Sequence, residues 1–182
     1  MINKKIYFYI DSIQDLNLDY IKKTKASLIL RESIKVPLIK YKFFVNECKK
    51  RRIRLYLSNN INLLFKLRIN GFYISAHNKK PYSWLRKINR NIKIIGSAHN
   101  LKEIFEKNNQ GCKEIVLSRL FKTKKKGYLD IAKFNLMTLV SNKNFIALGG
   151  INNKNIKKIS LINCKSFAML SELRNTPKYL IR

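Results

Sequence analysis

The sequence predicts an α/β protein, a compact (β/α)8 TIM barrel, on three observations. Short runs of Ile, Leu, Phe, Tyr and Val recur along the chain, as in strands buried within a parallel sheet. Segments with the apolar spacing of amphipathic helices lie between these runs. The runs number eight, which favours a closed barrel over its main alternative, an open doubly wound sheet. The length predicts a single domain, residues 1–182.

The predicted strands are residues 5–10, 26–31, 53–57, 71–75, 93–97, 114–118, 144–148 and 166–170. The clearest helical patterns cover residues 36–52, 100–111, 129–142 and 152–163. Pro37 suits the first turn of the earliest of these helices, because its missing N–H would have no partner there. Asn100 followed by Glu103 predicts a capped helix start, and Gly111 predicts the end of the same helix.

The chain after the eighth predicted strand is short. Few residues follow Ser171, and Pro177 interrupts them, so we expect the last helix to be short or missing. A barrel wall without its helix would expose apolar surface, and such surfaces tend to be covered by another protein molecule. This feature predicts a homo-oligomer.

The net charge is strongly positive. The chain has 39 Lys and Arg residues against 10 Asp and Glu, a formal charge of +29. Such a field favours polyanions, but the charge is spread along the whole chain together with abundant Asn and Ile, as drift toward adenine- and thymine-rich codons would produce. Segment 79–90, with Tyr82 and Trp84 among cations, is the best candidate for a nucleic-acid contact. We expect nucleic acid to bind only through non-specific charge.

Composition also bears on location and on metal binding. No apolar run reaches the roughly eighteen residues of a membrane span, and no small-residue cleavage site follows the basic N-terminus. We therefore expect a cytoplasmic protein without a membrane partner. Cys48, Cys112 and Cys164 are odd in number and far apart, with no CxxC pair. We expect reduced thiols and no structural metal, with Cys164 in the core.

Two adjacent glycines, Gly149 and Gly150, directly follow the seventh predicted strand. In a (β/α)8 barrel the functional groups stand at the carboxyl ends of the strands. Glycine at such a position lets backbone N–H groups approach a ligand closely, and a helix beginning near Asn152 would direct its positive end to the same point. The pattern predicts a phosphate site, and its alternative is a tight strand-to-helix turn without a ligand.

Seven segments resemble, in order and spacing, motifs of the thiamine-phosphate synthase family, which includes the TenI (thiazole tautomerase) branch. They are YFYID, LILRES, INGFYIS, IIGSAHNLKE, LSRLFKTKKKG, ALGGINNKNI and SFAMLSEL, and together they span roughly residues 5–173. The resemblance implies a TIM-barrel transferase of thiamine biosynthesis. It would join an aminopyrimidine diphosphate to a thiazole phosphate, release pyrophosphate and use Mg2+. The implied partners are phosphorylated heterocyclic small molecules.

The resemblance also implies roles for individual residues. Arg31, Ser97 and Lys126 are implied as catalytic: Arg31 grips the diphosphate, Ser97 lies near the pyrophosphate, and Lys126 belongs to a mobile loop. Arg31 and Lys126 also bind substrate or phosphate, together with Asn59, Asn78, Thr123, Gly149, Gly150 and Ser171. Within this set, Thr123 shares the loop of Lys126, and Gly150 and Ser171 match the backbone cradle of the thiazole phosphate.

The sequence departs from the family's pattern where the metal is held. Asn59 and Asn78 occupy positions of metal-binding carboxylates, and an amide oxygen brings no charge to Mg2+. We therefore name no metal ligand. Arg119 stands where the tautomerase branch carries a histidine. Two interpretations stay open: the lysines of segment 122–126 replace the charge of the metal in a working synthase, or the chain is a diverged member, either a pseudoenzyme or an enzyme acting on another phosphorylated metabolite.

Overall fold

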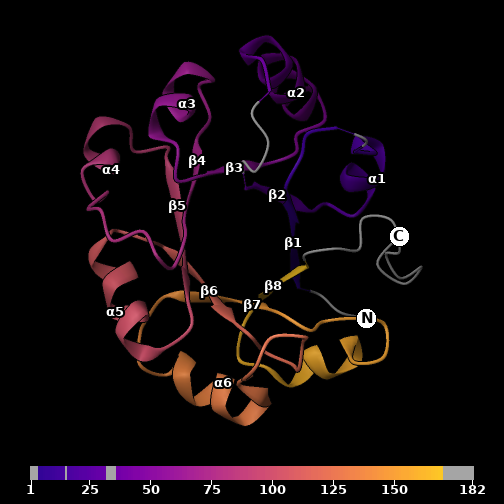
Figure 1. Ribbon diagram of the computed structural model, residues 1–182, viewed down its shortest axis with the longest axis vertical. Helices are drawn as coiled ribbons and strands as arrows, with labels where there is room; N and C mark the ends of the chain where they lie inside the picture. Colours follow the sequence, from indigo (N-terminus) through magenta and orange to yellow (C-terminus); the bar gives the residue numbers. More distant parts are fainter. Residues whose placement is uncertain (1–3, 15, 32–35, 170–182) are drawn as a thin grey trace.

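The strands form a closed ring with the helices around it (Figure 1). The computed structural model describes residues 4–14, 16–31 and 36–169. Neighbouring strands pair in parallel in chain order, and β1 pairs with both β2 and β8, which confirms the barrel and excludes an open sheet. The strands are β1 (Lys5–Ile10), β2 (Ser27–Leu30), β3 (Leu55–Ser58), β4 (Gly71–Ile74), β5 (Lys93–Ala98), β6 (Glu114–Ser118), β7 (Asn144–Leu148) and β8 (Ser166–Met169).

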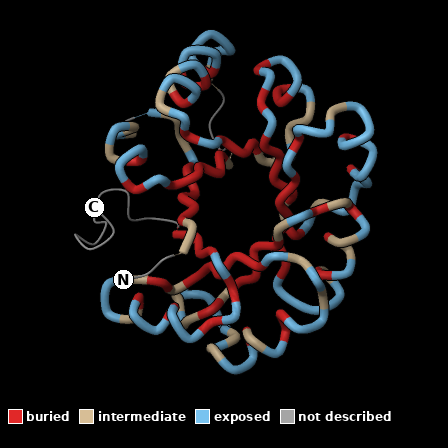
Figure 2. Tube along the Cα trace, turned by 180° about the vertical axis from the view of Figure 1, so that it is seen from behind, coloured by how far each residue is buried: buried red, intermediate tan, exposed pale blue. Residues whose placement is uncertain are grey.

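The helices lie outside the ring and bury only their inner faces (Figure 2). They are α1 (Leu18–Lys23), α2 (Leu38–Lys50), α3 (Ile61–Lys66), α4 (Leu85–Ile88), α5 (Leu101–Asn109), α6 (Asp130–Thr138) and the 3-10 helix η1 (Ile156–Leu161). Asn100 accepts a hydrogen bond from the N–H of Glu103 and Gly111 has φ +82°, so the predicted start and end of α5 are confirmed.

Alternate strand residues fill the inside of the barrel. This inner cluster contains Tyr7, Tyr9, Ile29, Tyr56, Tyr73, Ile95, Val116, Ile146, Leu148 and Ala168. A separate cluster joins the outward strand residues to the helices. The tyrosines are large enough to fill the barrel, and the rings of Tyr9 and Tyr73 meet edge to face with centroids 5.6 Å apart. Their hydroxyls, 3.1 Å apart, form a buried polar contact inside the barrel.

The expected helix over residues 152–163 is wrong in type and extent. The structure has a six-residue 3-10 helix, η1, that begins only at Ile156. Asparagine side chains hold the turn that precedes η1: Asn155 accepts from the N–H of Asn152 at 2.9 Å and donates to the carbonyl of Gly150 at 2.7 Å. In the part of the chain that the structure describes, no α-helix begins near Asn152.

The glycine pair after β7 has a packing reason. Gly149 and Gly150 have φ of +101° and +71°, and the loop between β6 and α6 runs directly over them. A Cβ on Gly150 would lie 2.7 Å from the carbonyl oxygens of Phe121 and Lys122. The N–H of Phe121 donates to the carbonyl of Gly149 at 3.0 Å. The glycines thus let the β6–α6 loop sit against the end of β7.

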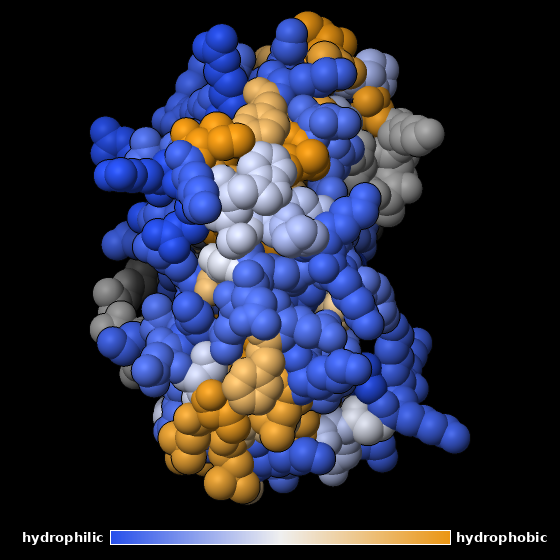
Figure 3. Space-filling view, turned by 90° about the vertical axis from the view of Figure 1, so that its left-hand side faces the viewer, coloured by the Kyte–Doolittle hydropathy of each residue, from blue (hydrophilic) through white to orange (hydrophobic). Residues whose placement is uncertain are grey.

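Apolar side chains remain exposed on the outer helices. Phe105 of α5 and Leu136 of α6 are more than half exposed, and Figure 3 shows orange patches toward the top and bottom of one face, with a mostly hydrophilic band between them. These patches are compatible with the homo-oligomer, which stays a prediction. The expected short or missing last helix falls on residues 170–182, outside the described residues. None of the helices in the described part of the chain is long and apolar enough to span a membrane.

The three cysteines are free and buried, and Cys164 lies in the core as predicted. Burial raises the pKa of the Cys48 and Cys112 thiols to about 12, because the interior disfavours the charged thiolate. These two groups therefore stay protonated at neutral pH and act as small apolar side chains.

Replacing Gly150 with alanine tests the packing of the glycine pair. We expect Gly150→Ala to lower the free energy of unfolding by about 3 kcal/mol, because a left-handed backbone and two carbonyl clashes add up. Gly127→Ala is the matched control: its φ is also positive at +77°, but the nearest atom is 3.9 Å away, so we expect a cost of about 1 kcal/mol. Urea unfolding of both variants measures the difference, and equal losses would contradict the packing argument.

Candidate functional site

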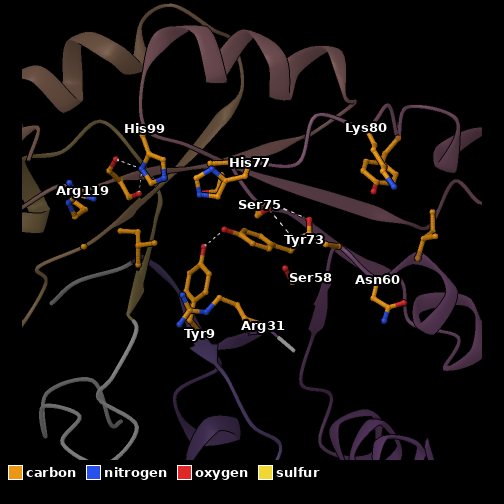
Figure 4. A pocket seen from close by; sticks show the side chains of 18 of the residues that line it. Tyr9, Arg31, Ser58, Asn60, Tyr73, Ser75, His77, Lys80, His99 and Arg119 are labelled. Carbon is orange, nitrogen blue, oxygen red and sulfur yellow. Dashed lines mark hydrogen bonds between the residues drawn. The ribbon is translucent and has the colours of Figure 1, made fainter. Parts of the chain in front are cut away.

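A cavity of about 1310 Å³ opens at the carboxyl ends of the strands. Residues from the ends of β1 to β7, or from the loops that follow these strands, line it (Figure 4). The carboxyl ends of parallel strands converge on one mouth of a barrel, so side chains far apart in the sequence meet there. The cavity is therefore the position in which the predicted site residues were expected.

The bottom of the cavity is polar and uncharged. Tyr9, Tyr73 and Ser97 line it, and the hydroxyls of Tyr9 and Tyr73 are hydrogen-bonded at 3.1 Å. Burial raises the pKa of Tyr73, although its hydrogen bonds with Ser97 and Tyr9 oppose the shift. Burial also raises the pKa of Tyr9. Both phenols stay protonated at neutral pH, so they can hydrogen-bond a ligand without adding charge.

Arg31 stands at the end of β2 with its guanidinium oriented by two partners. Nε and Nη2 each donate to a carboxylate oxygen of Asp11 at 2.9 Å, and the guanidinium lies over the ring of Tyr9, 5.3 Å from its centroid. The bidentate pair fixes the guanidinium plane. Because the arginine side chain is 40% exposed, a remaining edge is open to the cavity that it lines.

Asn59 and Asn78 are hydrogen-bonded to each other. Nδ2 of Asn78 donates to Oδ1 of Asn59 at 2.9 Å, and this bond is called the amide bridge below. Oδ1 of Asn59 also accepts the N–H of Ser75 at 3.1 Å, and Nδ2 of Asn59 donates to Oγ of Ser75 at 3.0 Å. Nδ2 of Asn78 donates further to the hydroxyl of Tyr82 at 3.1 Å. The amide bridge joins the loops after β3 and β4.

Two residues of the α5 region hold the loop of Asn78 from behind. Lys107 is fully buried, and its ammonium donates to the carbonyl of Asn78 and to Oε1 of Gln110, both at 2.8 Å. Nε2 of Gln110 donates to the carbonyls of Asn78 and Lys80, at 2.9 and 2.7 Å. Burial lowers the pKa of Lys107. Gly96 makes room for this side chain, since a Cβ there would lie 2.8 Å from the lysine Cδ.

The lysine-rich loop after β6 folds over one side of the cavity. Nε of Arg119 donates to the carbonyl of Gly127 at 3.1 Å, and its Nη2 donates to the carbonyl of Lys126. These bonds close the loop on itself. Thr123, Lys124 and Lys125 line the cavity, as does Arg119.

Two histidines, His77 and His99, also line the cavity. Nδ1 of His99 lies 2.9 Å from Oγ and 3.1 Å from the carbonyl oxygen of Ser118. The backbone N–H of His99 donates to the carboxylate of Glu103 at 2.7 Å. His99 therefore links the ends of β5 and β6. Figure 4 shows both histidine rings drawn above Tyr9 and Tyr73 in this view of the cavity.

The predicted site residues are brought together only in part. Arg31, Ser97, Asn59, Thr123 and Gly149 line the cavity. Asn78 lies behind the lining and contacts it through the amide bridge. Lys126 and Gly150 are not among the cavity's lining residues in the part of the chain that the structure describes: Lys126 bonds Arg119 through its carbonyl, and Gly150 packs under the β6–α6 loop. Ser171 lies outside the described residues.

The donor set at this site does not fit Mg2+. The described residues contain no group of three or more His, Cys, Asp or Glu side chains able to share a metal. The Oδ1 atom of Asn59 already accepts two hydrogen bonds, and Oδ1 of Asn78 accepts the N–H of Lys80 at 3.0 Å. Mg2+ requires oxygen ligands and favours carboxylates or phosphates among them.

Comparison with known proteins identifies the family of the chain. The family model described as thiamine monophosphate synthase matches residues 20–173. The chain belongs to the thiamine monophosphate synthase family. Thiamine-phosphate synthases of two Prochlorococcus marinus strains are similar: that of strain SARG is 32% identical over 130 residues, 69% of this chain, and that of strain AS9601 is 27% identical over 135 residues, 72% of this chain. The resemblance seen in the motifs is confirmed.

The chain spans less than two fifths of these two relatives, 37% and 38% of their lengths. Among solved structures, the thiamine phosphate pyrophosphorylase from Pyrococcus furiosus has a TM-score of 0.76 at 14% identity, over 98% of this chain and 91% of that one. A thiamine phosphate pyrophosphorylase from Bacteroides thetaiotaomicron has a TM-score of 0.61 at 15% identity, over 96% and 86%. At these identities the structural matches show the fold alone.

Removing the ammonium of Lys107 tests how the loop after β4 is held. Hydrogen bonds to charged groups contribute about 1.5–3 kcal/mol each, so we expect Lys107→Met to speed amide exchange in segment 75–80 by about tenfold. Hydrogen exchange measured by mass spectrometry gives the rates. Lys102→Met, a change of the same kind at an exposed position of α5, is the control and should leave the segment unchanged. Equal rates in both variants would show that Lys107 does not hold the loop.

Proposed function

We propose that the chain is a cytoplasmic, thiamine-phosphate-synthase-like transferase. It would bind an aminopyrimidine diphosphate and a thiazole phosphate in the cavity and join them to thiamine phosphate with release of pyrophosphate. Family membership supports this class of reaction. The observation that carries the proposal is the charge of the cavity, which matches two phosphorylated substrates.

The charged groups of the cavity are almost all positive. Arg31, Lys80, Arg119, Lys124 and Lys125 line it, and no Asp or Glu is found among its described lining residues. Asp11, at the rim, is paired with Arg31. A cleft lined by one sign of charge raises the local concentration of oppositely charged ligands. Three phosphate groups from the two substrates would meet this field.

The reaction depends on stabilising the leaving pyrophosphate and requires no proton transfer by an acid or a base. The bond between the pyrimidine methylene carbon and the diphosphate oxygen breaks, and its electron pair leaves with pyrophosphate. The lone pair of the thiazole nitrogen forms the new carbon–nitrogen bond, so no proton has to move. Cationic side chains that face the leaving oxygens lower the barrier by stabilising the charge that develops there. Arg31, Lys124 and Lys125, which line the cavity, would take this role, and Ser97 would donate a hydrogen bond.

The uncharged bottom of the cavity suits the heterocycle. Tyr9, Tyr73 and Ser97 offer hydroxyls that act as donors or acceptors at neutral pH. A methylene carbon with cation character would face phenol rings, whose faces attract positive charge. These residues would orient the pyrimidine ring while the cations above them hold its diphosphate.

A second interpretation follows from the amide bridge. Because amides stand where the family has metal-binding carboxylates, the chain is alternatively a diverged member that handles another phosphorylated metabolite. The same cationic cavity would serve such a ligand.

Product formation decides between the two. With aminopyrimidine diphosphate and thiazole phosphate, we expect thiamine phosphate and pyrophosphate to accumulate. Arg31→Met should lower kcat/KM by about a hundredfold, the usual loss for one charged contact to a developing anion. Arg52→Met removes the same charge at the opposite, amino-terminal end of β3 and should stay within about twofold. Folded protein that forms no product would overturn the synthase proposal in favour of the second interpretation.

A further inference from the structure

Each polar side-chain atom of Asn59 and Asn78 has a hydrogen-bond partner within the protein. Oδ1 of Asn59 accepts from Ser75 and Asn78, and Nδ2 of Asn59 donates to Ser75. Nδ2 of Asn78 donates to Asn59 and to Tyr82, and Oδ1 of Asn78 accepts from Lys80. An amide carries both a donor and an acceptor, so two amides can bond each other directly. The two loops are therefore joined without a bound cation.

Carboxylates at the same two positions would behave differently. Two ionised carboxylates offer only acceptors and repel each other at hydrogen-bond distance, so they need a proton or a cation between them. A divalent ion does this and also joins the loops that carry them. In this chain the amide bridge joins the loops, and the buried ammonium of Lys107 reinforces it from behind at 2.8 Å from the carbonyl of Asn78.

The second task of a metal is to neutralise phosphate charge, and here side chains are present for that task. Arg31 comes from the end of β2, Lys80 from the loop after β4, and Arg119, Lys124 and Lys125 from the loop after β6. Figure 4 shows Arg119 and Lys80 on opposite sides of the cavity with Arg31 between them. Positive charge on several sides repels Mg2+ and attracts a diphosphate.

We propose that this cavity binds the diphosphate group of its substrate through side-chain cations alone, without a divalent ion, and that the amide bridge replaces the metal as the link between the loops. The identity of the substrate rests on the proposed function. The mode of binding does not, because inorganic pyrophosphate carries the same phosphate chemistry.

The test is calorimetric titration of the full chain with inorganic pyrophosphate, in EDTA and in Mg2+. We expect binding in EDTA that is as tight as in Mg2+ or tighter, since Mg2+ competes for pyrophosphate in solution. Binding that is tenfold or more tighter in Mg2+ would overturn the inference and leave the proposed function standing. Conversely, absence of turnover with metal-independent pyrophosphate binding would defeat only the proposed function.

The double variant Asn59→Asp/Asn78→Asp sharpens the test, because it restores the two carboxylates. In EDTA we expect at least tenfold weaker pyrophosphate binding and a lower Tm than in the unchanged protein, and Mg2+ should recover both. The control, Asn46→Asp/Asn142→Asp, adds the same two negative charges at exposed positions away from the cavity and should show no such response to Mg2+. A Tm of the unchanged protein that rises with Mg2+, or a double variant that ignores the ion, would contradict the proposal.

Discussion

The hydrogen bond between the side chains of Asn59 and Asn78 joins the loops after β3 and β4, and the cavity wall on that side depends on it. Ser75 and Tyr82 bond to this pair, and Lys107 and Gln110 hold its loop from behind. Each of these bonds contributes only about 1–3 kcal/mol. Together they hold the loop in place, so the wall is ordered before a ligand arrives and less ordering entropy is lost on binding.

The closed barrel decides where the positive charge of the chain acts. A formal charge of +29 is spread over the whole sequence and by itself predicts only a general affinity for anions. Because the strands close into a ring, the residues that follow β2, β4 and β6 meet at one mouth. There the cations gather around uncharged tyrosines, and the described lining offers no carboxylate to offset them. Composition supplies the cations, and the topology gathers some of them around one cavity.

The sequence predicted the strands well, because buried parallel strands are nearly continuous apolar runs, and each predicted boundary in the described residues lies within two residues of the observed one. It predicted a helical pattern over residues 152–163, where the structure has only the short 3-10 helix over Ile156–Leu161. The motif resemblance identified Arg31 and Asn59, but the sequence did not identify Tyr9 and Lys107. Both faces of a barrel strand are buried, so alternation does not mark the inward tyrosine, and a lysine on a helix is expected to be exposed until its tertiary partners are known.

The most direct measurement is anomalous diffraction from crystals grown with pyrophosphate and Mn2+, because Mn2+ binds where Mg2+ would and scatters anomalously at its absorption edge. The account predicts pyrophosphate held by Arg31 and the lysines, the amide bridge intact, and no manganese peak beside Asn59 and Asn78. A manganese peak that bridges Oδ1 of Asn59 and the pyrophosphate oxygens would contradict the central claim, and it would show that an amide can stand in for a carboxylate at this metal site.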